Sequence, residues 1–142
     1  FMHFEKYDDA IADFSKALEL NYIDFGVYVN RAVSYIKGFE LYKLAIDDYN
    51  KAIILNPISA LAYTDRGGAY AEGSKDFDSA LKDFYKAIEL DPNYADAYLG
   101  LGLTLYQLGK KKEACINWKK AYELGCEKAK KYLDSSFCKK YI

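Results

Sequence analysis

The stretch YKAIELDPNY, residues 85–94, contains the pattern that decides the fold. It contains Lys86 and Ala87, two further residues and Leu90, and then Pro92, which ends the secondary-structure element before it. The same frame of Lys-Ala, two residues and Leu recurs at 16–20, 51–55 and 120–124, in steps of 35, 35 and 34 residues. A fixed period of this length is the signature of a repeat architecture, in which one structural unit is written several times.

A second alanine stands seven residues before the alanine of each frame. Seven residues are two turns of a helix, so the two alanines of a pair lie on one helical face. An aromatic residue lies between them, four positions after the first alanine. The four sets are Ala10, Phe14 and Ala17; Ala45, Tyr49 and Ala52; Ala80, Phe84 and Ala87; and Ala114, Trp118 and Ala121. A stripe of small, aromatic and small residues predicts close packing against another helix.

The partner helix is predicted upstream in each unit, at residues 25–38, 60–72 and 95–108. Apolar or small residues recur there at i, i+4 and i+7, which is typical of an amphipathic helix. Glycines at 38, 73 and 109 are expected to end or loosen this helix, and Pro57 or Pro92 follows the second one. The unit is therefore an antiparallel helical hairpin. It cannot bury its stripe alone, so we expect the hairpins to stack into a curved array.

These residues resemble the tetratricopeptide repeat, a unit of 34 residues with aromatic, Leu-Gly, Tyr, Ala, aromatic, Ala and Pro positions. Two successive units of this sequence carry the pattern as Tyr63, Gly67, Tyr70, Ala80, Phe84, Ala87 and Pro92, and as Tyr98, Leu101, Gly102, Ala114, Trp118 and Ala121. The earlier unit carries it as Tyr28, Ala32, Tyr35, Ala45, Tyr49, Ala52 and Pro57. The resemblance implies an all-α fold, a right-handed superhelical stack of antiparallel helical hairpins.

The expected division of the single domain follows the period. Residues 1–24 form a partial repeat with only its second helix, residues 25–59, 60–94 and 95–128 form repeats, and residues 129–142 form a C-terminal capping helix. The start inside a repeat suggests a piece of a longer protein. Two units carry one extra residue in the turn, within KGFELYKLA and EGSKDFDSA, which we expect to change the turn and leave the stacking intact. The capping helix is predicted from one apolar stripe, Ala129, Tyr132, Leu133, Phe137 and Tyr141.

Composition excludes several functional classes. Hydrophobic residues make up 51% of the 142, enough for a core, and the net charge of −1 does not indicate nucleic-acid binding. No apolar run approaches the ~18 residues of a membrane span, and the first residues do not resemble a signal peptide. The three cysteines, Cys115, Cys126 and Cys138, lack the spacing of a zinc site or a disulfide framework. We expect packing cysteines in a reducing compartment, a cytoplasmic location, and no cofactor or metal.

Catalytic constellations are also missing. His3 is the only histidine and lies at the very start of the chain. The pairs Asp8–Asp9 and Asp47–Asp48 point in different directions on a helix and are better explained as helix-terminal charges. We therefore expect no enzyme. The lysines between 110 and 140 leave two interpretations open, a basic patch for acidic partners or the solvated face of a cap.

In the family that this sequence resembles, the first helix of each hairpin lines a concave groove. Carried over, the groove positions also include Lys37, Asp65, Gly68, Ala71, Glu72, Asp96 and Gln107. The predicted partner-binding residues are Val29, Asn30, Val33, Ile36, Leu61, Thr64, Leu99, Leu103 and Tyr106. Apolar side chains facing water commonly mark a binding site, and the alternative is that some of them pack against neighbouring helices.

One activity known in the family is not supported. Members that clamp a terminal carboxylate need lysine, asparagine and arginine at set groove positions. Asn30 matches one of them, but Leu61 and Asp65 occupy the lysine and arginine positions of the next unit. The resemblance therefore implies a scaffold that binds a peptide or helix of a partner protein in a largely apolar groove. The alternative is a self-association module that forms homo-oligomers through the groove or the N-terminal face.

Overall fold

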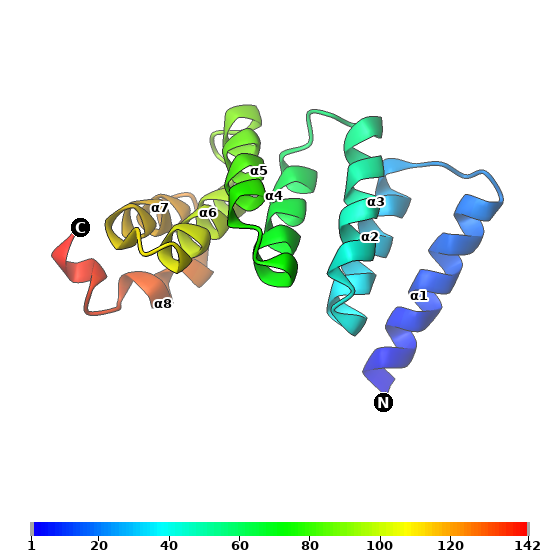
Figure 1. The fold of residues 1–142 in the computed structure, drawn as a ribbon, viewed down its shortest axis with the longest axis horizontal. Coiled ribbons are helices and arrows are strands. Elements are labelled where there is room, and N and C mark those ends of the chain that lie inside the picture. Colours follow the sequence, from blue (N-terminus) through cyan, green and yellow to red (C-terminus); the bar gives the residue numbers. More distant parts are fainter. Residues whose placement is uncertain (1, 142) are drawn as a thin grey trace.

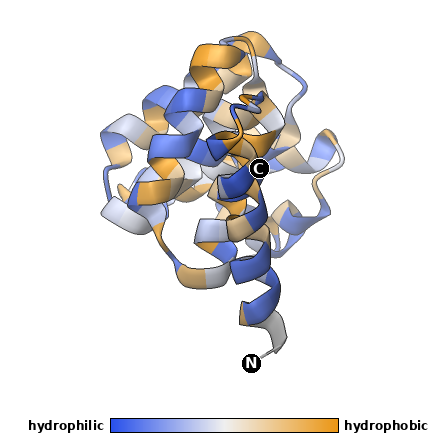
Figure 2. Ribbon diagram, turned by 90° about the vertical axis from the view of Figure 1, so that its right-hand side faces the viewer, coloured by the Kyte–Doolittle hydropathy of each residue, from blue (hydrophilic) through white to orange (hydrophobic). Residues whose placement is uncertain are grey.

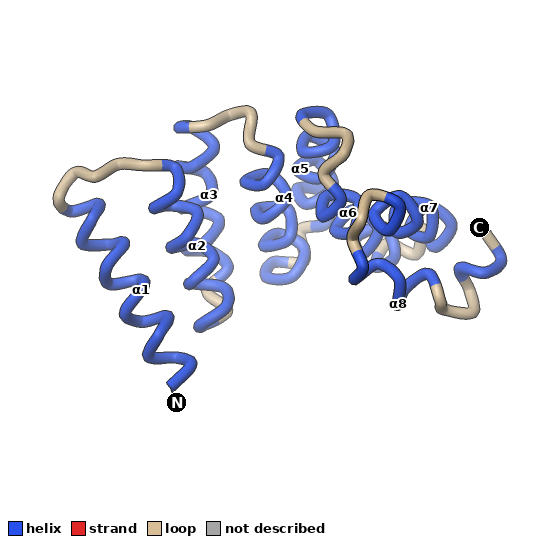
Figure 3. The backbone as a smooth tube through the Cα atoms, turned by 180° about the vertical axis from the view of Figure 1, so that it is seen from behind, coloured by secondary structure: helices blue, strands red, loops and turns tan. Residues whose placement is uncertain are grey.

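The computed structural model describes residues 2–141, without the side chains of Met2 and His3, so the role considered for His3 lies outside the described part. The helices follow one another in a single curved row, and the N- and C-terminal ends lie at opposite ends of it (Figure 1). No strand occurs among residues 2–141 (Figure 3), which confirms the predicted all-α class. The helices are α1 (Met2–Glu19), α2 (Phe25–Phe39), α3 (Tyr42–Leu55), α4 (Ala60–Ala69), α5 (Phe77–Leu90), α6 (Ala95–Gln107), α7 (Lys111–Glu123) and α8 (Lys130–Leu133).

Successive helices pack most extensively in the pairs α2–α3, α4–α5 and α6–α7, and α1 packs on α2. The alanines and aromatic residues of the predicted stripes are buried in the three complete hairpins, and Tyr49, Phe84 and Trp118 are each at most 2% exposed. In α1, where α2 is the packing partner, Ala10, Phe14 and Ala17 are only half-buried. Hydrophobic and hydrophilic segments alternate along the helices (Figure 2), as expected when one face of each is covered.

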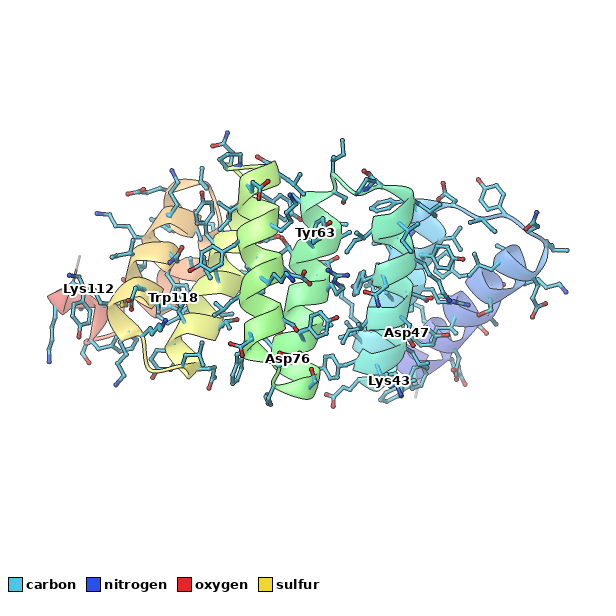
Figure 4. All side chains as sticks on the ribbon, turned by 45° about the horizontal axis from the view of Figure 1, so that its top comes forward. Lys43, Asp47, Tyr63, Asp76, Lys112 and Trp118 are labelled. Carbon is cyan, nitrogen blue, oxygen red and sulfur yellow. A yellow bond between two sulfur atoms is a disulfide. The ribbon has the colours of Figure 1, made fainter. Side chains whose placement is uncertain are left out.

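Polar side chains fix several helix beginnings. The Asp24 carboxylate accepts hydrogen bonds from the backbone N–H groups of Gly26 and Val27 at the beginning of α2. Asp76, at the N-terminal end of α5 (Figure 4), accepts one from the Ser79 N–H at 3.1 Å. Ser59 does the same for Ala62 at the beginning of α4. These caps satisfy backbone donors that a helix leaves unpaired in its first turn.

Gly38 and Gly73 have a role other than the predicted one. The left-handed residues that end these helical segments are Glu40 (φ 54°) and Lys75 (φ 55°), and only Gly109 (φ 78°) ends a first helix as expected. A Cβ atom on Gly38 would lie 2.7 Å from the Tyr7 Cβ, and one on Gly73 would lie 2.3 Å from the Tyr42 Cβ. Glycine is therefore needed at 38 and 73 because a neighbouring tyrosine comes too close for any side chain.

The extra residue of the second long turn is absorbed locally. After α4 the chain continues as a π-helical turn, η1 (Tyr70–Ser74), before the left-handed Lys75 begins the turn into α5. A π-helical turn accommodates one additional residue without breaking the helix. Helix α4 still packs on α3, α5 and α6, so the stacking is preserved.

The C-terminal end differs from the prediction of one capping helix over residues 129–142. It consists of η2 (Glu127–Ala129), α8 and η3 (Cys138–Lys140), separated by turns. A disulfide between Cys138 and Cys115 of α7 returns the chain to the array, with the two Cα atoms 5.5 Å apart. The expectation of three unpaired cysteines is therefore wrong. The partners are 23 residues apart, and only the turns after α8 bring them together; Cys126 is free and buried.

An ion-pair ladder links the first and second helices, and it shows that the expectation of Asp48 as a helix-terminal charge is wrong, because Asp48 is buried in the middle of α3. Arg31 donates two hydrogen bonds to Asp48 of α3, at 2.7 and 2.8 Å, and a third to Ser15 of α1. Arg66 repeats the arrangement with Asp83 of α5, at 2.8 and 2.7 Å, and with Asn50 of α3. Each arginine therefore ties three helices together through a planar, bidentate contact. In the last hairpin Leu101 and Asn117 occupy the corresponding positions, and the ladder ends.

The ladder predicts non-additive mutational effects. Replacing Arg66 with Leu leaves Asp83, whose side chain is 6% exposed, without its cation, so we expect a loss of about 3 kcal/mol in the free energy of unfolding. Adding Asp83→Asn, which copies the Leu101–Asn117 combination, should restore part of that loss. Urea unfolding of the three proteins measures this, and equal losses in the single and double variants would contradict it.

The disulfide predicts redox-dependent stability. Closing a loop between partners that are 23 positions apart in the sequence is worth about 3 kcal/mol in the chain-entropy account, so the Cys115→Ser, Cys138→Ser variant should unfold at lower denaturant concentration. Reductant should lower the stability of the natural sequence and leave that variant unchanged. Thiol titration of the unfolded, unreduced protein should find one free thiol, that of Cys126; three would show that the bond is not formed.

Candidate partner-binding groove

Three depressions lie along the side of the array that the first helices α2, α4 and α6 form. The polar depression lies between α2, α4 and the beginning of α6, and the apolar depression lies between α4, α5 and α6. The aromatic depression lies between α6, α7 and the C-terminal segment. Gly68 and Glu72 line both of the first two, and Leu103 and Gln107 line both of the last two. We call this continuous surface the groove.

The apolar depression is open because glycines stand where side chains would fill it. Gly68 on α4 has no atom within 4 Å of the place where a Cβ would be, so it leaves space open. Gly100 on α6 allows close contact with Phe84, since its Cβ would lie 2.4 Å from that ring. Phe84 forms the floor, and Ala71, Phe77 and Leu103 also line the depression. Its volume of about 190 Å³ exceeds the ~150 Å³ of an apolar cavity that takes benzene.

The polar depression contains a carboxylate that lacks a partner. Asp65 on α4 is half-buried, and within residues 2–141 no hydrogen bond or ion pair reaches its oxygens. Burial, followed by the nearby Asp96 carboxylate, raises the pKa of Asp65 to about 6, against a lowering effect of Lys37. The charged form is thus disfavoured by its surroundings, as expected for a desolvated acid beside a like charge.

Asp65 also raises the pKa of two nearby tyrosines, Tyr94 and Tyr49, of which Tyr49 lines the polar depression. Burial first, and then the Asp65 and Asp96 carboxylates, raise the pKa of Tyr94 to about 12. Burial and the same Asp65 carboxylate raise the pKa of Tyr49, whose ring packs in the hairpin core. Both hydroxyls therefore stay protonated at neutral pH, and the formal charges of this depression come from its carboxylates and lysines.

The aromatic depression is built by the C-terminal segment. Trp118 of α7 (Figure 4) stacks on Tyr132, with ring centroids 4.8 Å apart, and Tyr106 stacks on Phe137 at 5.3 Å. The Trp118 Nε1–H is buried and has no acceptor within the described part of the chain. Aromatic pairs at these separations are attractive, so the segment closes the open face of α6 and α7 in place of another repeat.

Some of the predicted groove residues line the three depressions, and others lie outside them. Val33, Ile36 and Thr64 line the polar depression, Leu103 lines the other two, and Tyr106 lines the aromatic one. Asn30 and Leu61 are exposed but line none of the three, and Leu99 is half-buried against the last hairpin. Val29 does not face the groove, because it is 8% exposed and packs in the core of the α2–α3 hairpin.

Sequence reasoning missed the floor of the groove. Phe84 and Gly100 were assigned to helix packing or to no role, although both line the apolar depression. It also missed the contribution of Tyr132 and Phe137 as groove walls, because that depends on the turn after α8. The lysines between 110 and 140 are exposed, as a solvated cap requires, and two of them, Lys128 and Lys131, reach the edge of the groove.

Among the described residues, no group of three His, Cys, Asp or Glu side chains has metal-binding geometry. None of their helices combines the length and the apolar character that crossing a membrane requires.

Comparison with known proteins identifies the family. A model described as TPR repeat matches residues 74–109, and one described as tetratricopeptide repeat matches residues 95–124. A crystal structure of MamA protein is 31% identical, with a TM-score of 0.73 over 87% of this chain and 67% of that one. The chain belongs to the tetratricopeptide repeat family. None of the curated proteins matches it.

Two further solved structures are similar to this repeat protein. YrrB, described as a TPR protein with an unusual peptide-binding site, is 27% identical, with a TM-score of 0.76 over 87% of this chain and 62% of that one. The first TPR of Spaghetti (RPAP3), bound to the HSP90 peptide SRMEEVD, is 28% identical, with a TM-score of 0.66 over 78% of this chain and 94% of that one. As a tetratricopeptide repeat protein, the chain has the architecture of a protein-interaction scaffold.

The raised pKa of Asp65 predicts a pH-dependent stability. Because the folded state holds this proton more tightly than the unfolded chain does, the charged carboxylate destabilises the fold increasingly as the pH rises from 3.8 to about 6. The Asp65→Asn variant should therefore be more stable than the natural sequence above that range, by at most about 3 kcal/mol. The difference should vanish near pH 4. Urea unfolding across this range measures it, and a difference independent of pH would contradict it.

Proposed function

We propose that this tetratricopeptide repeat protein binds an extended peptide segment of another protein in the groove. The observation that carries the proposal is the apolar depression that Gly68 leaves open above Phe84. Such a hollow offers a place where an apolar side chain of the partner loses contact with water, which is the main source of affinity at protein interfaces. Of the predicted residues, Val33, Ile36, Thr64, Leu103 and Tyr106 contact the peptide.

Similar proteins support a peptide as the partner. The structure of YrrB is described as having a peptide-binding site, and the first TPR of Spaghetti was solved with a peptide bound. The groove of this chain is continuous across three hairpins, so an extended segment can contact several depressions at once. The array supplies a preformed surface, which lowers the entropy cost of binding. No bond chemistry and no cofactor enter this proposal.

Self-association and a cytoplasmic location are two further predictions that stay proposals. Self-association through the groove or the N-terminal face is the alternative, and it is supported by exposed side chains near α1 such as Phe4 and Tyr22, which are 53% and 64% exposed. A molar mass that rises with concentration in light scattering would favour self-association.

The cytoplasmic location stays a prediction, and the Cys115–Cys138 disulfide counts against it, because such bonds persist in oxidising compartments.

Gly68 allows a direct test of the groove. A leucine there projects into the open space of the apolar depression, and we expect it to weaken peptide binding at least about tenfold, because it occupies the place of the partner's anchor. The ligands come from a random peptide library displayed on phage and selected on the natural sequence. Enriched peptides are synthesised with a fluorescent label, and their dissociation constants are measured by anisotropy.

Gly68→Ala is the matched control. It adds only a methyl group where nothing lies within 4 Å, so binding should change little, and the better helix propensity of alanine should raise stability by about 1 kcal/mol. Equal binding of peptides to the Gly68→Leu variant and the natural sequence would exclude the apolar depression as the binding site. A library from which no peptide is enriched would exclude peptide binding.

A further inference from the structure

We propose that the polar depression holds a lysine or arginine side chain of the bound peptide, next to the apolar anchor above Phe84. This inference rests on the proposed function and names the chemistry of its partner. The polar and apolar depressions share Gly68 and Glu72, so one short peptide contacts both. The recognised segment therefore combines one apolar and one basic residue.

The first argument is the charge inside the depression. Asp65 of α4 and Asp96 of α6 line it, and Glu72 borders it toward the apolar depression. Asp65 is half-buried and receives no hydrogen bond or ion pair from the part of the chain that the structure describes. Asp96 receives only a long contact of 3.8 Å from the Cys126 thiol. A partly buried carboxylate without a partner is less favourable than one fully in water, and a cationic donor reduces this penalty through charge-assisted hydrogen bonds.

The second argument is independent of the carboxylates. Thr64 lines the same depression, is 7% exposed, and its Oγ1 has no hydrogen-bond partner among residues 2–141. The hydroxyls of the other buried serine and threonine residues, Ser34 and Thr104, donate to the carbonyl groups of Asn30 and Gly100 at 2.9 Å. A buried hydroxyl without a partner is unusual in a native fold. Its oxygen has lone pairs that accept a hydrogen bond from an ammonium or guanidinium group.

The lysines at the rim suggest a rival interpretation, in which the polar depression binds an anionic side chain. Lys37 of α2 and Lys128 of η2 also line the polar depression, and an anionic side chain would be drawn to them. Both are exposed, so their ammonium groups stay in water at the edge. The carboxylates of Glu72 and Asp96 are exposed as well, whereas Asp65 is half-buried, and the three carboxylates that line the depression outnumber its two ammonium groups. The deeper part of the depression is therefore negative, and the geometry favours a cation.

The inference is tested with a synthetic peptide array. Each peptide is extended, carries one leucine, and has lysine, glutamine or glutamate at a second position whose distance from the leucine is scanned. The proteins are the full chain with its natural sequence, Asp65→Asn, Asp65→Asn with Asp96→Asn, Lys37→Gln and Gly68→Leu. Dissociation constants of the best series are measured by fluorescence anisotropy at low ionic strength, and circular dichroism checks that every variant is helical.

We expect the natural sequence to bind the best lysine peptide about tenfold more tightly than its glutamine counterpart. The Asp65→Asn variant should lose most of this preference and keep its affinity for the glutamine peptide. Because the asparagine removes an unfavourable charge, this variant is also expected to fold. The Lys37→Gln variant should retain the preference for lysine, which separates the effect from a general change in charge.

Three results would contradict the inference, and each has a different meaning. Equal affinity for the lysine and glutamine peptides, with binding abolished by Gly68→Leu, overturns the inference and leaves groove binding in place. Preference for the glutamate peptide that is lost in Lys37→Gln overturns it in favour of an anionic partner. The absence of binding to every peptide of the array overturns the inference and the proposed function together.

Discussion

The close approach of two helices within each hairpin is the constraint on which the structure depends. Phe84 and Trp118 lie against Gly67 and Gly102, where a Cβ would come within 3.2 and 2.6 Å of the rings. The alanines that flank each aromatic residue are fully buried, so neither side of the contact has room for a larger side chain. This interface repeats with the period of the sequence, and the curved row of helices results from adding one such unit to the next. A single enlarged residue at the contact therefore disturbs a whole unit.

The ion-pair ladder is a second, more directional set of contacts, in which the ion pairs lie within a hairpin and the hydrogen bonds to Ser15 and Asn50 reach the preceding one. Arg31 and Arg66 each reach across three helices, and stacking of Arg66 over Tyr63 and Tyr70, at 5.5 and 5.9 Å, holds its guanidinium plane. Buried ion pairs add little net stability compared with apolar packing, but they penalise any arrangement that separates the partners. Each ion pair therefore holds together the two helices of one hairpin, and the hydrogen bonds to Ser15 and Asn50 link that hairpin to the one before it. In the last hairpin, where Leu101 replaces the arginine, apolar contacts and the Cys115–Cys138 disulfide stabilise the packing instead. The C-terminal segment after α7 therefore supports this hairpin.

The parts of this fold that could be predicted are those that repeat. The alanines and the aromatic residues between them predict which face of the second helix of each hairpin is buried. A pattern that recurs in four units indicates this even where single residues depart from it. Features outside these stripes were missed or misread, even where they recur in two units. Gly38 and Gly73 were predicted as helix ends, although each accommodates a tyrosine from a neighbouring helix. The pairing of Cys115 with Cys138 depends on turns after α8 that carry no periodic signal, and the floor of the groove depends on which face of Phe84 the neighbouring glycines leave uncovered.

Under the proposed function, Phe84 connects stability with binding. One part of its ring packs in the α4–α5 hairpin, while another forms the floor of the apolar depression between Gly68 and Gly100. Gly100 must stay small because its Cβ would collide with the ring, whereas the open space at Gly68 is not required by packing. A glycine inside a helix lowers stability, so its presence where no neighbour demands it needs another reason. In the proposed function, that reason is room for a partner's side chain beside Phe84, whose own ring is only 2% exposed.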